Sequence, residues 1–183
     1  MSVRKYLSKK TVHPVLAKFV SRVRAMANRL KKLTNFFVTG GIAGIALWIG
    51  TALHWIPWVI YLTWVGYVLT QSTLSIGLKL LVTFVAGTLA AWMVVELGSI
   101  ALPVLEQFAL PVALFAVVGG IALLDKFPPF DWVPIYYMGM VAFFAAGAQP
   151  EFSTISALVM PATMGVFCGW LEVKLRLLLT SEP

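Results

Sequence analysis

The side chains that could do chemistry in this chain are few and lie far apart. His13 and His54 fall in different regions, and Cys168 is the single cysteine. A metal site needs clustered histidine, cysteine or carboxylate ligands, so the sequence predicts neither a metal site nor a cofactor. It also holds no GxSxG, HExxH or phosphate-binding glycine motif. Because catalysis requires titratable groups that converge on one point, we expect that the protein is not an enzyme.

Gln71 and Gln149 each follow a short apolar segment of the same design. The segments begin with Trp-x-Pro at Trp55 and Trp132, continue with aromatic and small apolar residues, and end at the amide. Each apolar body has about 14 to 16 residues, whereas a helix that crosses ~30 Å of hydrocarbon needs about 20. Short apolar segments at matching places in two halves of a membrane protein point to a binding site.

The polar residues around the two glutamines are the candidates for that site. An unpaired amide within hydrocarbon costs several kcal/mol, so each glutamine needs a polar partner. Thr73 and Thr154 follow the glutamines closely and are candidates, together with them, for the lining of a solute path. Glu96, the carboxylate deepest in an apolar stretch, is the fifth candidate. In the alternative interpretation, the amides cap helix ends and Glu96 reaches water by snorkelling.

The composition identifies the class of protein that carries these residues. The chain is 60% hydrophobic and 11% charged, with a mean hydropathy of +0.90, whereas a soluble domain has a charged share of about 25%. This indicates an integral membrane protein. Ten of the fourteen Lys and Arg residues lie between Arg4 and Lys32. The positive-inside rule assigns this block to the cytoplasmic side, so we expect no nucleic-acid partner.

The basic block forms the first of three predicted regions. Residues 1–34 are a cytoplasmic segment, 35–174 the transmembrane domain and 175–183 a cytoplasmic tail. Apolar residues from Pro14 to Leu33 recur at spacings of three and four between basic residues. This pattern predicts an amphipathic helix that lies on anionic lipid headgroups. The alternative is a regulatory helix that binds another protein.

Six membrane spans are predicted in the transmembrane domain, with Pro103 and Pro111 at the entrance of the fourth. With a cytoplasmic amino terminus, every later Lys and Arg falls on the inner side, which satisfies the charge bias. Both termini are then cytoplasmic. Glu172, beside Lys174 and Arg176, is interpreted as a member of an ion pair at the interface. The predicted spans are 36–53, 56–70, 76–99, 105–124, 132–148 and 155–171.

The two short segments belong to a longer internal match. Gly-Gly-Ile-Ala at 40–43 recurs at 119–122, Trp-x-Pro at 55–57 recurs at 132–134, and Ser-Thr-x-Ser at 72–75 recurs at 153–156. A repeat of three spans starts on opposite sides of the membrane in its two copies. We therefore predict an all-α polytopic membrane protein that consists of two inverted three-helix repeats, preceded by the amphipathic basic helix.

Several of these features together resemble a known family. They are the glycine-rich first span, Trp64 to Gly66, the two glutamines and the small-residue helix from Pro161 to Gly169. Over about Phe36 to Leu171 the chain resembles the bacterial inner-membrane proteins grouped as domain of unknown function 1097. The resemblance implies a small multi-span membrane protein and carries no substrate or catalytic residues. The basic segment lies outside it.

Two functions fit these features. The paired short helices and the scarcity of charge in the spans favour a channel or transporter for a small neutral or weakly polar solute. A homo-oligomer with a pore would suit that function. The alternative is a membrane scaffold or accessory subunit that does not transport, with the basic segment as its docking surface.

Overall fold

The computed structural model describes residues 14–70, 73–147 and 149–180, and these are almost entirely helical, without a strand. Apolar sequence of this kind favours helices because they satisfy their own backbone hydrogen bonds. Three stretches are long and apolar enough to cross a membrane: Leu33–Ala52, Ser75–Lys126 and Phe152–Leu179. The six α-helices are α1 (Pro14–Ala52), α2 (Pro57–Leu69), α3 (Leu74–Leu105), α4 (Ala109–Leu123), α5 (Val133–Ala145) and α6 (Phe152–Thr180).

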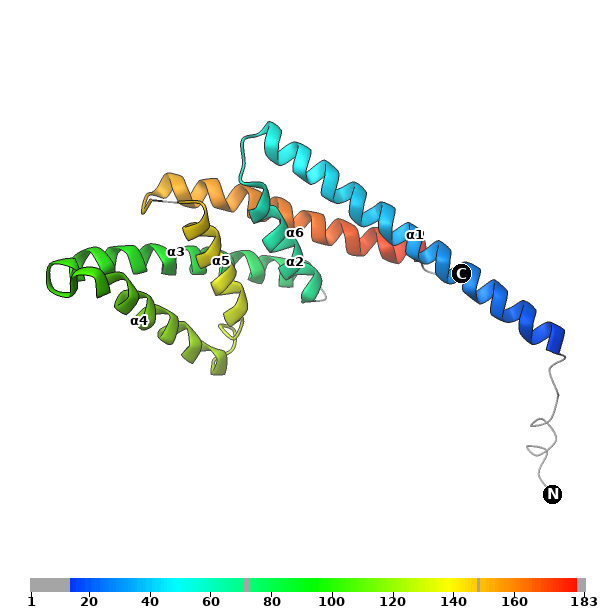
Figure 1. Ribbon diagram of the computed structural model, residues 1–183, viewed down its shortest axis with the longest axis horizontal. Helices are drawn as coiled ribbons and strands as arrows, with labels where there is room; N and C mark the ends of the chain where they lie inside the picture. The colour runs from blue at the N-terminus through cyan, green and yellow to red at the C-terminus, as the bar shows by residue number, and fades with distance from the viewer. Residues whose placement is uncertain (1–13, 71–72, 148, 181–183) are drawn as a thin grey trace, which may run out of the picture.

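The amino-terminal helix differs from the prediction of a surface helix followed by a separate span. α1 is one continuous helix of 39 residues. No proline or glycine interrupts it between Pro14 and Gly40, so nothing in the sequence breaks the backbone ladder. Its first half extends past the end of α6 and away from the other helices (Figure 1).

α3 and α4 form a helical hairpin whose turn lies later than predicted. Pro103 was expected at the entrance of the fourth span but lies inside the last turn of α3. A short 3₁₀ helix, η3 (Glu106–Phe108), then reverses the chain. Gly98 contacts Leu110 across the hairpin. α6 is also longer than predicted, because it continues through the expected tail to Thr180.

The two short helices match their predicted segments and cross the long helices in the same way. α2 and α5 have 13 residues each and are thus about 20 Å long. α2 crosses α6 where the Ile60 carbonyl oxygen lies against Gly165, and α5 crosses α3 where the Tyr136 carbonyl oxygen lies against Gly87. A Cβ atom on either glycine would clash with backbone. Both crossings therefore require glycine.

The long helices α3 and α6 form the centre of the fold. They run antiparallel, because Gly77 near the start of α3 contacts Val166 of α6 and Trp92, further along α3, contacts Phe152 at the start of α6. α1 packs on α6 and α4 on α3, on opposite sides of the central pair (Figure 1). The buried core between these helices is mainly apolar and includes Phe84.

An ion pair joins α3 to the segment before α5. The Lys79 ammonium donates a hydrogen bond of 2.8 Å to the Asp131 carboxylate and lies 4.3 Å from the centre of the Trp132 ring. This hydrogen bond holds the pKa of the Asp131 carboxyl below its ordinary value of 3.8. The contact brings together two connecting regions that the charge pattern assigns to the same side of the membrane.

Candidate functional site

The predicted solute-path residues fall into separate places. Gln71 lies outside the described residues. Gln149 is exposed, and its backbone carbonyl accepts hydrogen bonds of 2.8 Å from the Glu151 amide and the Thr154 hydroxyl. The structure thus brings Gln149, in the turn before α6, together with Thr154 in the first turn of α6.

Glu96 and Thr73 lie on or beside α3, far from each other. Glu96 is exposed and accepts a hydrogen bond of 3.1 Å from the indole N–H of Trp92. Thr73 is also exposed and directly precedes α3. Their separation of 23 positions corresponds to about 34 Å of helix, so these two candidates do not share one site.

A different carboxylate, Glu172, is buried among polar partners from three helices. Only 3% of its surface is exposed. One carboxylate oxygen accepts a hydrogen bond of 2.6 Å from the Thr39 hydroxyl, and the other accepts one of 2.7 Å from the Trp64 indole N–H. Arg176 pairs with Glu172 and donates a hydrogen bond of 2.9 Å to Thr39. We call these four residues the Glu172 cluster.

The helices bring the cluster together in a simple way. Glu172 and Arg176 are four residues apart on α6, a spacing that places two side chains on the same helix face. α1 packs on this face and contributes Thr39, whereas α2 crosses α6 and contributes Trp64. The crossing at Gly165 lies two helical turns before Glu172 on α6. This crossing fixes the position of Trp64 along α6.

The cluster satisfies its buried charge internally. An unpaired carboxylate in a membrane span is costly, and such groups usually pair with one another and mark functional positions. Here the guanidinium neutralises the carboxylate, and the side chain of Arg176 is 40% exposed. The predicted pairing of Glu172 is confirmed with Arg176, and the Glu172 carboxylate is buried. Lys174 is exposed and has no part in the cluster.

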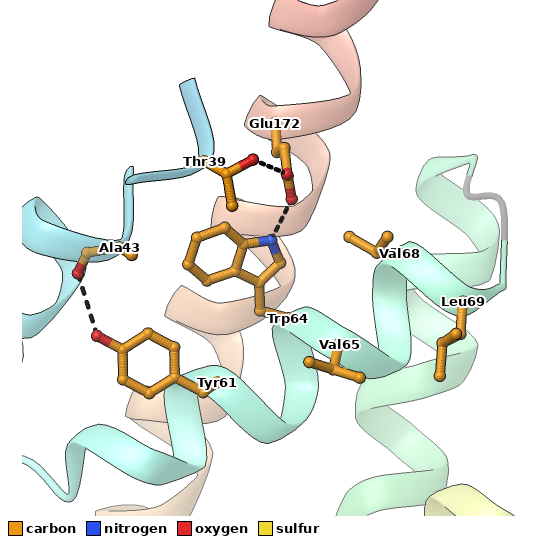
Figure 2. A pocket seen from close by; sticks show the side chains of 8 residues that line it. All are labelled: Thr39, Ala43, Tyr61, Trp64, Val65, Val68, Leu69 and Glu172. Carbon is orange, nitrogen blue, oxygen red and sulfur yellow. Dashed lines mark hydrogen bonds between the residues drawn. The ribbon is translucent and has the colours of Figure 1, made fainter. Parts of the chain in front are cut away.

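A cavity of about 330 Å³ opens beside the cluster, between α1 and α2. This volume lies at the small end of the range for ligand pockets. Figure 2 shows Trp64 and Tyr61 along the same stretch of α2, with the Tyr61 hydroxyl directed at the Ala43 carbonyl oxygen, which it reaches at 3.1 Å. Apart from Thr39 and Glu172, the wall is apolar or aromatic; its other residues are Ala43, Tyr61, Trp64, Val65, Val68 and Leu69.

The crossing of α5 over α3 has no such cluster. Four residues after Ile60 on α2 comes Trp64, whereas four residues after Tyr136 on α5 comes Met140. Seven residues after Gly165 on α6 comes Glu172, whereas seven residues after Gly87 on α3 comes Val94. Met140 and Val94 are buried apolar residues. The polar cluster therefore forms at the α2–α6 crossing and not at the α3–α5 crossing.

Sequence reasoning found the Glu172 pair but missed its position in the fold. The local signal is the Glu-x-x-x-Arg spacing on one helix. Thr39 and Trp64 lie 133 and 108 residues from Glu172 in the chain. No local pattern indicates that they meet it.

A comparison with protein families gives one match. A family model described as "Protein of unknown function (DUF1097)" matches residues 37–175. The match confirms the resemblance stated above and includes every member of the Glu172 cluster except Arg176. No curated protein and no solved structure matches the chain.

Proposed function

This chain belongs to the DUF1097 family, whose function is unknown, and from that premise we propose that it is a channel or transporter for a small neutral or weakly polar solute. In this proposal it is a multi-pass protein of the bacterial inner membrane, with both termini in the cytoplasm. It catalyses no reaction. Two inverted three-helix halves, α1 to α3 and α4 to α6, form the transport unit, and the solute passes near the Glu172 cluster.

The observation that carries the proposal is the buried carboxylate of Glu172, which pairs with the half-buried Arg176 in an apolar helix. A purely structural bundle gains little from such a pair, because well-packed apolar residues in its place are often neutral or stabilising. The corresponding positions at the α3–α5 crossing, Met140 and Val94, are apolar. A polar group at only one of two similar crossings is typical of a site rather than of packing.

The equivalent crossings support the inverted halves. Exchange of α1 to α3 with α4 to α6 turns the crossing at Gly165 into the crossing at Gly87, and turns the α1 packing on α6 into the α4 packing on α3. Figure 1 is consistent with this exchange, since α1 and α4 lie on opposite sides of the central pair.

The neutrality of the cluster favours an uncharged solute. Arg176 already compensates the Glu172 carboxylate, and the neighbouring cavity is mainly apolar. A charged solute would enter without a counter-ion and would pay the cost of desolvation.

Flux into proteoliposomes tests the proposal. Liposomes with the purified protein should take up acetamide or glycerol faster than protein-free liposomes. Glu172→Gln should slow this uptake, whereas the matched variant Glu96→Gln, at an exposed carboxylate that also accepts a bond from a tryptophan, should not. If neither probe, nor a small acid or a dissolved gas, crosses faster than through protein-free liposomes, the transport proposal is wrong. The double variant Gln71→Leu with Gln149→Leu tests the two glutamines among the predicted solute-path residues in the same assay.

One observation favours the second candidate function, that of a scaffold or accessory subunit. The basic first half of α1 extends beyond the helical bundle (Figure 1), where it could bind anionic headgroups or another protein. A stoichiometric partner that co-purifies with the full chain, and is lost when residues 1–34 are deleted, would favour the scaffold. A homo-oligomer with solute flux would favour transport.

A further inference from the structure

The cavity between α1 and α2 is a groove with the features of a lipid-binding site. Its walls come from small residues of α1 on one side and from one face of α2 on the other. Along α2 the lining extends from Tyr61 to Leu69, eight residues or about 12 Å. One leaflet of a bilayer has about 15 Å of hydrocarbon. The groove is therefore long enough to hold most of one acyl chain.

The protein itself does not fill this groove. The Tyr61 ring, with its hydroxyl on the Ala43 carbonyl, holds α1 away from α2. The outer wall is open, because Val65 is 51% and Leu69 is 72% exposed. In a membrane, lipid chains are the apolar molecules that surround such a groove.

The Glu172 cluster lies at one end of the groove. Thr39 and Glu172 line that end, and both contact Arg176. The Arg176 guanidinium pairs with Glu172, and 40% of the Arg176 side chain is exposed. A guanidinium has five N–H donors and can contact a phosphate as well as a carboxylate. In the sequence, Lys31 and Lys32 precede Thr39 by about two turns of α1.

We propose that this groove binds one anionic phospholipid of the cytoplasmic leaflet, with an acyl chain between α1 and α2 and the phosphate against Arg176. Basic positions between membrane helices on this side are where anionic headgroups bind. The acyl chain of the lipid covers the apolar wall, and its phosphate contacts the Arg176 guanidinium. This lipid site does not depend on the transport proposal, since a scaffold would use it equally.

Native mass spectrometry of the full chain in mild detergent tests the site. With phosphatidylglycerol and phosphatidylethanolamine added in turn, one phosphatidylglycerol should remain bound in preference. Val65→Trp, which fills the groove from its open side, should weaken binding about tenfold, the effect of displacing two methylenes. Val112→Trp, at a position of α4 that is 48% exposed, is the matched control and should retain the lipid.

The headgroup contact is tested separately. Arg176→Gln should reduce the preference for phosphatidylglycerol over phosphatidylethanolamine about fivefold, and the control Lys174→Gln should not. Glycerol phosphate, which lacks an acyl chain, should not displace the lipid; displacement would indicate a simple phosphate site. Unchanged lipid binding in Val65→Trp, or equal loss in Val112→Trp, would refute the groove. A protein dimer that Val65→Trp dissociates would instead assign it to a second copy of the chain.

Discussion

Replacement of Glu172 by glutamine, which exchanges one carboxylate oxygen for an amide group, should destabilise the fold strongly. The carboxylate accepts hydrogen bonds from Thr39 and Trp64 and pairs with Arg176. A hydrogen bond to a charged group contributes about 1.5–3 kcal/mol and a neutral one about 0.5–1.5 kcal/mol, so three weakened interactions amount to about 3 kcal/mol. Because the Arg176 side chain is 40% exposed, hydrogen bonds from its guanidinium to water offset part of this loss. We expect a loss of about 2–3 kcal/mol.

The assay is thermal unfolding of the purified protein in detergent, followed by circular dichroism. For a chain of this size each kcal/mol lowers the Tm by about 2–4 °C, so Glu172→Gln should lower it by about 4–12 °C. Glu96→Gln is the control, because Glu96 is exposed and accepts one bond from its own helix; its effect should stay within about 0.5 kcal/mol. Equal Tm values for the two variants would refute the assignment of Glu172 as the centre of a buried cluster.

Three other features give predictions of their own. Gly165→Ala places a methyl group against the backbone of α2 and should destabilise by more than about 1 kcal/mol, whereas Gly119→Ala, at an open position, should be neutral in the same unfolding assay. Because the folded pKa of Asp131 is lowered by Lys79, its stabilisation is present above the unfolded value of about 3.9 and is lost as pH falls through the folded value. The wild type should therefore lose more stability than Asp131→Asn below about pH 4, and parallel pH curves would contradict the pair. Cys168 is buried, so a maleimide should label it only after denaturation; rapid labelling of the native protein would contradict its burial.

The short helices were well predicted because their signals are local. Proline begins α2 directly at Pro57 and lies at Pro134 in the first turn of α5, and a polar segment follows each apolar run. The boundary between α3 and α4 was not predicted well. Both helices are apolar, so hydropathy gives one continuous stretch, Ser75–Lys126. Pro103 suggested a break there, yet a proline is tolerated in the last turn of a helix within an apolar bundle.

The candidate site was predicted less well than the fold. The sequence pointed to Gln149 and Glu96, whose types and depth suggested function, but both are exposed in the structure. The Glu172 cluster depends on contacts between α1, α2 and α6, which are far apart in the chain. Its members look ordinary one at a time: a threonine, a tryptophan and a salt-bridge pair. Only the packing of α2 over α6 brings them together.

The glycine crossings have a mechanical consequence. α2 contacts α6 at Gly165 through the Ile60 carbonyl oxygen and the small Thr63 hydroxyl, so the two helices touch over a short length about which α2 could rotate. A rotation about it would move the Pro57 end and the Leu69 end of α2 in opposite directions, and α5 has the same arrangement on α3. Rotation of the two short helices in opposite directions about these contacts would widen one side of the protein and narrow the other.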